Sequence, residues 1–464
     1  MTDYIVAIDL GTSHITGIVG EKNTDGTFSI VACETEEPAS CIRRGIIFNR
    51  DNTAEHIKNV LRKLERYLKG DHIDKVYIGV NGQSLHTIDH IEAKDIEEGA
   101  AVTNEDIEAL KKQCELYKHD LTDVLDIVPA VYYVDGRKDS KPVGVPCRKL
   151  EANYKLVVGR PSIRRDIAIS IDLAGKEMAG IIVAPLALAD AMLSSEEKEL
   201  GCALVDFGAG VTSVTIYKNG DLLHMSVIPL GGNLITRDIT SLQVTDSDAE
   251  KLKIEHGSAI LQKEDEDEVI KVNMEGAVND IELKDLNAII EGRAKEIVDN
   301  VFARISETAD IKSLGSGIVL AGNGSELKNL PELIKEKCKT NVKVRQSAIR
   351  GGLVRGADDM VGNPLYMTAI SLMLKGEKQC VSTMAVLEDD NVITQQGNDA
   401  DFKPKDEKPE DGKRGGFFSR KKNGYSQKGS GSSVSKSEGG DKSGGKGERE
   451  GGIGRFIGSF FDET

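Results

Sequence analysis

The sequence of 464 residues contains no tryptophan, and aromatic residues make up only 4% of it. It also lacks an excess of basic residues, because its formal net charge is −16. Binding to nucleic-acid backbones requires concentrated Lys and Arg, so we predict no nucleic-acid partner. An apolar fraction of 39% over this length is sufficient for the cores of two or three domains.

Paired cysteines and long apolar runs are missing as well. The seven cysteines are scattered, with no CxxC pair and no histidine at metal-ligand spacing, so we expect reduced thiols. No run of about eighteen apolar residues occurs, and the N-terminus lacks the basic and apolar regions of a signal peptide. We therefore expect a cytoplasmic protein that does not span a membrane.

The first motif is IVAIDLGTSHITGIVG, residues 5–20, which predicts a strand, a tight turn and a second strand. The turn begins at Asp9, and the backbone amides of Gly11, Thr12 and Ser13 are expected to surround an anion. A carboxylate beside a phosphate is repulsive unless a hard cation lies between them, so Asp9 indicates Mg²⁺ held through water. An ordinary hairpin turn is the alternative for this motif taken alone.

The pattern recurs roughly two hundred residues later, as ALVDFGAGVTSVTIYKNG over residues 203–220. There a strand ends at Asp206, a glycine-containing loop follows, and a second strand closes at Asn219-Gly220, which is a hairpin turn signal. A third segment, residues 317–330, predicts an apolar strand, a glycine turn and a helix capped by Ser325. Close backbone approach at a helix N-terminus suits a nucleotide.

These three loops, in this order, resemble those of the actin-like ATPase superfamily and, within it, of the FtsA family of bacterial cell-division proteins. Residues 249–259 are similar to the adenosine-contacting helix of bacterial actins, and residues 363–376 resemble the helix that ends the FtsA core. The resemblance implies an α/β, actin-like (duplicated ribonuclease-H-like) two-lobed ATPase fold with an inserted α/β subdomain and a disordered C-terminal tail.

The resemblance also implies ATP and Mg²⁺ as ligands, with the metal held through water by Asp9 and Asp206. Three positions depart from the family pattern: Ala209 and Val211 replace the usual Gly and Thr, and Asn323 replaces a Gly. We therefore expect slow hydrolysis at most and assign no catalytic residue. The nucleotide-binding residues implied are Asp9, Gly11, Thr12, Ser13, Asp206, Gly208, Ala209, Gly210, Val211, Thr212, Glu250, Lys253, Gly322, Asn323, Gly324 and Ser325.

The chain divides into nine expected segments. Residues 1–82 form the first half, and residues 162–195 return to it and include the connecting helix. Residues 83–161 form the inserted subdomain, with a helix capped by Thr103 and strands over 124–134, 142–148 and 154–158. The others are the second half (196–233), its subdomain (234–307), its return with the adenosine loop (308–360), the final core helix and strands (361–390), a disordered linker (391–451) and an amphipathic segment (452–464).

The linker is rich in Gly, Ser, Lys and Glu, so we expect it not to fold by itself. The last segment carries Ile453, Phe456, Ile457, Phe460 and Phe461 at the spacing of one helix face, with Arg455 beside it. It is too short to span a bilayer and is expected to fold on an anionic lipid surface. The alternative is a helix that docks on the protein's own core.

Together these features predict a nucleotide-gated scaffold rather than a conventional enzyme. By resemblance, it polymerises into filaments at the cytoplasmic face of the inner membrane at the division site, as a peripheral protein, and tethers the tubulin-like protein FtsZ. The resemblance also implies that the inserted subdomain recruits other divisome proteins; an insertion that only adds stability is the alternative. The alternatives are a small-molecule kinase, which needs a catalytic base that no residue outside the loops supplies, and a chaperone-type ATPase, which needs a substrate-binding β-domain.

Overall fold

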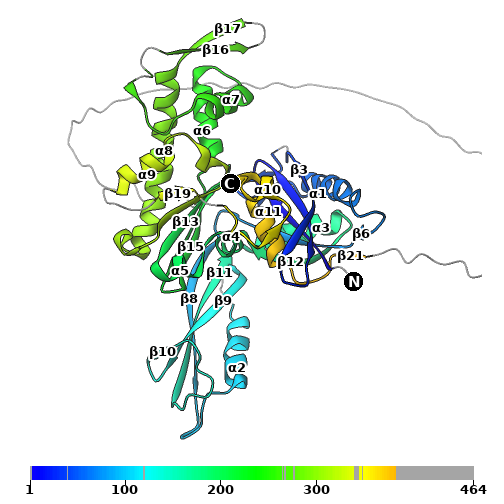
Figure 1. Ribbon diagram of the computed structural model, residues 1–464, viewed down its shortest axis with the longest axis vertical. Coiled ribbons are helices and arrows are strands. Elements are labelled where there is room, and N and C mark those ends of the chain that lie inside the picture. The colour runs from blue at the N-terminus through cyan, green and yellow to red at the C-terminus, as the bar shows by residue number, and fades with distance from the viewer. Residues whose placement is uncertain are drawn as a thin grey trace, which may run out of the picture. The chain divides into compact units, whose positions relative to one another are not determined.

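A six-stranded sheet carries the first Asp-Gly hairpin in the computed structural model (Figure 1). The structure describes residues 3–382, apart from 39, 119–120, 264, 266–267, 275–276, 339–343 and 347, and these residues belong to one compact unit. The predicted hairpin is confirmed as β1 (Asp3–Leu10) paired antiparallel with β2 (Ile15–Lys22). The strand order of this first sheet is β12-β7-β1-β2-β3-β20, with β3 at Phe28–Glu36, β7 at Lys75–Val80, β12 at Glu177–Val183 and β20 at Val354–Arg355.

Two helices pack against each other beside this sheet, α1 (Arg50–Glu65) and α3 (Pro161–Leu173). The side chain of Asn49 accepts the amide of Asn52 at the start of α1, and α3 begins with a proline, whose missing N–H costs nothing in the first turn. We call the first sheet with these helices the first lobe.

The second sheet repeats the arrangement of the first. Its corresponding strands are β13 (Cys202–Phe207), β14 (Thr212–Lys218), β15 (Asp221–Ile228), β18 (Gly317–Ala321) and β19 (Val344–Gln346), in the order β15-β14-β13-β18-β19. In both lobes the first three strands are antiparallel and the next two run parallel to the first strand. The register repeats as well, because Asp9 faces Thr16 and Asp206 faces Ser213. This confirms the predicted duplication.

Four helices complete the second lobe: α6 (Gly232–Ile239), α7 (Asp246–His256), α8 (Leu283–Thr308) and α9 (Leu330–Cys338). Helix α8 turns an apolar stripe from Leu286 to Ile305 into the core of this lobe. A hairpin of β16 (Val269–Met274) and β17 (Ala277–Glu282) precedes it.

Helices α4 (Ala184–Met192) and α11 (Pro364–Lys375) pack against each other between the two sheets. Helix α11 contacts the first sheet and α4 contacts β14 of the second (Figure 1). The approach of α11 is close: a Cβ at Gly79 would lie 2.3 Å from Leu372 Cδ1, so a larger residue on β7 would push the helix away. The lobes therefore share one core at this layer.

Smaller elements connect these parts. They are β4 (Ile42–Arg43), β5 (Ile46–Ile47), β6 (His72–Ile73), α5 (Ser195–Leu200), α10 (Asp358–Val361), β21 (Val381–Ser382) and 3₁₀ turns at Thr240–Leu242, Ile311–Ser313 and Asn323–Glu326. Strands β4 and β5 form a short hairpin between β3 and α1.

The inserted subdomain consists of β8 (His86–Asp95), α2 (Asn104–Glu115), β9 (Asp123–Val134), β10 (Arg137–Asp139) and β11 (Lys149–Gly159), with its own core. The predicted cap of α2 is confirmed, because Thr103 and Asp106 form a reciprocal capping box. The strand predicted over 142–148 is wrong. Pro142 and Pro146 lack the amide that a ladder needs, and only an isolated bridge between Ala101 and Pro146 forms.

Strand β8 was missed, and it links the inserted subdomain to the second lobe. It pairs with β11 along its length and with β15 through His86 and Ser226, so one nine-stranded sheet runs through both parts. Sequence reasoning overlooked β8 because only one residue in the strand, Thr87, is fully buried.

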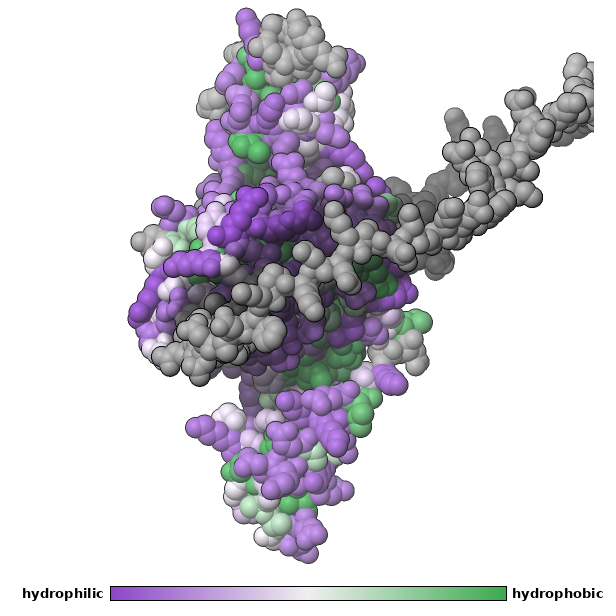
Figure 2. All heavy atoms as spheres, turned by 90° about the vertical axis from the view of Figure 1, so that its right-hand side faces the viewer, coloured by the Kyte–Doolittle hydropathy of each residue, from purple (hydrophilic) through white to green (hydrophobic). Residues whose placement is uncertain are grey.

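Hydrophilic side chains dominate the face shown in Figure 2. All seven cysteines are free, as expected, and six of them are buried. None of the helices within the described residues is both long and apolar enough to cross a bilayer. The predicted linker and the amphipathic segment, with Ile453 and Phe456, lie outside the described residues.

Candidate functional site between the two lobes

The first and second loops, residues 9–13 and 206–212, meet where the two lobes face each other. A Cβ at Gly210 would lie 2.4 Å from the Thr12 side-chain oxygen, so no larger residue fits at Gly210 without displacing Thr12. Each loop follows the end of the first strand in its sheet, which explains why two segments distant in sequence arrive at equivalent positions. The structure thus brings together Asp9, Thr12, Asp206 and Gly210.

The two aspartates at this junction have little access to water. Asp206 is 7% exposed and Asp9 is partly buried. Burial, with a further contribution from the charge of Asp206, raises the pKa of Asp9 from 3.8 to about 7. Burial also raises the pKa of Asp206, to about 6, although hydrogen bonds from Ser213 and Asn81 act in the opposite direction. A cation between the carboxylates would favour the ionised form of both.

Asn81 is a member of the site that sequence reasoning missed. Its Nδ2 lies 3.4 Å from Asp206 Oδ2, while its Oδ1 is buried and has no hydrogen-bond partner among the described residues. The repeat could have revealed it, because Asn81-Gly82 follows β7 as Asn323-Gly324 follows β18.

The donor set of this junction fits a magnesium ion. Two carboxylates and an unsatisfied amide oxygen are hard oxygen donors, which Mg²⁺ prefers, and Mg²⁺ commonly keeps several waters. Within the described ranges no group of three His, Cys, Asp or Glu side chains is arranged to bind a metal directly. The fit is therefore to an ion held largely through water.

The third loop, residues 322–325, lies directly against the second. Gly322 has φ +79°, and a Cβ there would lie 2.4 Å from Asp206 Oδ1, so this glycine permits both the backbone conformation and the close approach. The predicted helix cap at Ser325 is wrong. A 3₁₀ turn at Asn323–Glu326 comes first and α9 begins only at Leu330, while Ser325 Oγ donates to the carbonyl of Gly322.

Several backbone and hydroxyl groups of the second loop are already engaged. The Gly208 amide donates to Val211 O, and the carbonyls of Gly208 and Ala209 accept the amides of Gly232 and Asn233 at the start of α6. Thr212 Oγ1 donates to Leu230 O, 2.8 Å away, so its hydroxyl stabilises the loop. Only the other backbone amides of this loop therefore remain as the predicted donors to phosphate.

Glu250 and Lys253 lie on α7 and are tied to each other and to α6. Lys253 Nζ lies 2.7 Å from Glu250 Oε2, 2.9 Å from Thr236 Oγ1 and 3.3 Å from Gly232 O. Since the Gly232 amide donates to Gly208 O, the two predicted adenosine-contacting residues are connected to the second loop through α6.

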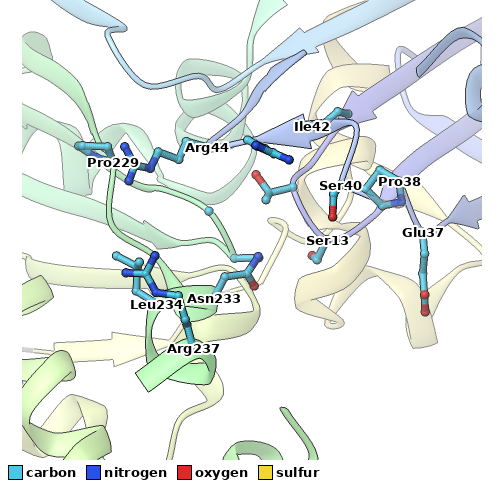
Figure 3. A pocket seen from close by; sticks show the side chains of 14 residues that line it. Ser13, Glu37, Pro38, Ser40, Ile42, Arg44, Pro229, Asn233, Leu234 and Arg237 are labelled. Atoms are coloured by element: carbon cyan, nitrogen blue, oxygen red, sulfur yellow. The ribbon is translucent and has the colours of Figure 1, made fainter. Parts of the chain in front are cut away.

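A cavity of about 390 Å³ opens over the tips of the first and second loops. Thr12, Ser13, Ala209 and Gly210 form part of its wall (Figure 3). Further lining comes from the segment around the β4–β5 hairpin and from the region of α6 on the other lobe. These residues are Glu37, Pro38, Ser40, Ile42, Arg43, Arg44, Pro229, Asn233, Leu234 and Arg237. None of the arginines was singled out from the sequence.

A duplicated α/β core with paired aspartate loops between its lobes defines the actin-like class of ATPase folds. In agreement, the structure resembles the PilM-PilN type IV pilus biogenesis complex, with a TM-score of 0.53 and 16% identity over 80% of this chain and 97% of that chain. The likeness at this identity shows the fold.

Sequence comparison gives the family. A model described as "Cell division protein FtsA" matches residues 203–371, and one described as "SHS2 domain inserted in FTSA" matches residues 82–158. Cell division protein FtsA of Porphyromonas gingivalis is 33% identical over 72% of this chain and 71% of its own length, and that of Bacillus subtilis is 30% identical over 80% and 83%. The chain belongs to the FtsA family of cell-division proteins.

Proposed function

We propose that this protein binds Mg-ATP between its lobes and couples that binding to filament assembly at the membrane. The observation that carries the proposal is the contact of the two aspartate loops, in which Gly210 of one lobe approaches Thr12 of the other. A ligand that touches both loops must respond to any movement between the lobes, so its binding favours one closure state.

Asp9 and Asp206, with Asn81, would hold Mg²⁺ through water, and the metal would supply positive charge beside the phosphates. The available amides of residues 11–13 and 209–211 would face those phosphates. Glu250 and Lys253 would meet the ribose or base, and the third loop would back the adenine. Hydrolysis is expected to be slow, because the cavity wall offers only one carboxylate, Glu37, and Val211 has no hydroxyl.

Membrane attachment is assigned to residues 452–464. Burying five large apolar side chains is worth at most about 8–15 kcal/mol, and ordering a dozen residues offsets most of this, at ~1–2 kcal/mol each. One tail would therefore bind weakly, whereas a filament with many tails would bind firmly. The linker adds attraction to anionic lipids, since residues 403–450 contain thirteen Lys or Arg and eight Asp or Glu.

The partner proposed for this scaffold is FtsZ, which would bind the subdomain of residues 234–307, while the inserted subdomain of residues 83–161 would recruit other division proteins. The family membership supports both assignments. The other segments of the chain would have the bounds expected from the sequence.

The test is cosedimentation with vesicles containing anionic lipid, with Mg-ATP or without nucleotide, in the presence and absence of FtsZ. Mg-ATP should increase the pelleted fraction of the full chain, and FtsZ should pellet only when the full chain is present. FtsZ that stays in the supernatant under all conditions would refute the tethering role. A chain lacking the last twelve residues is the matched control, because its nucleotide site is unchanged.

A further inference from the structure

Three arginines line the cavity above the loops in a chain that is otherwise acidic. Arg43 and Arg44 belong to the first lobe and Arg237 to α6 of the second, and all three are exposed. Among the described residues, none of the three lies within ion-pair distance of a carboxylate. Glu37 is the single acidic residue of the lining. The cavity therefore carries unneutralised positive charge contributed by both lobes.

The turn that presents Arg44 is held in a defined position beside the first loop. Gly45 N donates to Thr12 Oγ1 at 3.0 Å, and Gln83 N donates to Arg44 O at 3.0 Å. A Cβ at Gly45, where φ is +70°, would lie 2.0 Å from Asn81 O. Arg44 itself has φ +50°, which is unusual for a non-glycine residue and persists only where the surroundings fix the backbone. The backbone at Arg44 is thus held in place by the first loop and by the segment that follows β7.

The arginines differ in what they contact. The guanidinium of Arg43 lies 3.9 Å over the ring of Phe48, whereas Arg44 makes only a long contact of 3.5 Å with Gln83. Arg237 lies in the last turn of α6 and makes no side-chain hydrogen bond with any described residue. In Figure 3 the Arg44 side chain extends toward Pro229 of the second lobe. Arg44 and Arg237 are therefore the side chains available for an anion between the lobes.

We propose that Arg44 and Arg237 bind the terminal phosphate of a nucleoside triphosphate from opposite lobes, so that a triphosphate, and not a diphosphate, favours lobe closure. The inference rests on the proposed nucleotide function and adds to it the side chains that distinguish a triphosphate from a diphosphate. Without an anion, bringing two guanidinium groups toward each other is unfavourable. A terminal phosphate at the loop tips reverses that effect, because its oxygens accept charge-assisted hydrogen bonds from both arginines.

The full-length chain should be titrated by calorimetry with Mg-ADP and with the Mg complex of a non-hydrolysable ATP analogue. Arg44→Gln and Arg237→Gln should each weaken analogue binding roughly tenfold while changing ADP binding less than about twofold. Glu37→Gln should strengthen analogue binding, because it removes the negative charge of the cavity. That gain cannot result from misfolding. Arg66→Gln, an exposed site at the end of α1, is the control for the loss of one charge and should alter neither affinity.

The proposal would be overturned if the ratio of the dissociation constants for Mg-ADP and for the analogue is unchanged in both arginine variants. This holds whether both affinities stay the same or both fall equally. Failure of the unaltered protein to bind either nucleotide has a different meaning, because it would refute the nucleotide function itself.

Discussion

Thr12 and Gly210 belong to different lobes and are in direct contact, with so little space that a Cβ on Gly210 would lie 2.4 Å from Thr12 Oγ1 and 2.9 Å from Thr12 Cβ. Thr12 also accepts the amide of Gly45, so the same side chain connects the second loop with the β4–β5 turn. A change at either residue is therefore expected to act on the relation between the lobes.

Gly210→Ala should force the two loops apart. Overpacking of this kind costs about 1–3 kcal/mol, so nucleotide binding should weaken by roughly tenfold to a hundredfold if both loops contact the ligand. Calorimetric titration with Mg-ATP measures the effect. Adding Thr12→Gly to this variant should restore part of the affinity. Gly292→Ala on α8, where a Cβ meets nothing within 4 Å, is the control and should leave binding intact. Full affinity in Gly210→Ala would show that the loops do not act together.

The buried aspartates predict an unusual pH dependence of stability. The pKa of Asp9 is raised to about 7 and that of Asp206 to about 6, from 3.8 in both cases, so between pH 4 and 7 the folded state binds more protons than the unfolded state. Their contribution to the free energy of unfolding is present at low pH and is lost as pH rises through this range. Asp9→Asn should therefore become more stable relative to the unaltered protein as pH rises from 4 to 8.

Urea unfolding of the nucleotide-free protein at several pH values measures this difference. Asp172→Asn changes an exposed carboxyl on α3 and is the control for the loss of one acidic side chain. A stability difference for Asp9→Asn that does not change with pH would contradict the environment that the structure gives this carboxyl.

The affinity for Mg-nucleotide, unlike the stability, should increase from pH 5 to 8, because the metal needs both carboxylates ionised.

The amphipathic segment predicts that Phe456→Glu releases the protein from vesicles. The charge would fall on the predicted apolar face, where its burial in the lipid interface is unfavourable. Vesicle cosedimentation measures the bound fraction, and nucleotide affinity should not change. Ser459→Glu adds the same charge on the polar side of the predicted helix and is the matched control. Continued pelleting of Phe456→Glu would show that another part of the chain attaches it.

Much of the fold could be predicted because the decisive signals are local. Apolar strands ending in Asp-x-Gly revealed both hairpins, and the cap at Thr103 revealed the start of α2. The strand at 142–148 was predicted wrongly because β-branched residues there outweighed two prolines, and β8 was missed because most of its residues are polar or exposed. Ser325 has a side chain suited to capping, but contact with the second loop selects a 3₁₀ turn instead.

The site was harder to predict in those parts that depend on tertiary contacts. Both aspartates were visible as motifs, whereas Asn81 acquires its place only because β7 lies beside β1. Arg44 and Arg237 come from opposite lobes and share no local pattern, so only the folded chain brings them to one cavity.

If the two aspartate loops bind nucleotide through a metal ion, ATP binding must depend on Mg²⁺ and on Asp206, and calorimetric titration of the full chain with ATP measures both dependences. Measurements with Mg²⁺ and with EDTA should be made for the unaltered protein and for Asp206→Asn, with Asp172→Asn as the control. We expect ATP binding to require Mg²⁺ in the unaltered protein and in the control, and the affinity to fall roughly tenfold or more in Asp206→Asn. Equal affinity for ATP in all three proteins, with or without Mg²⁺, would contradict this expectation.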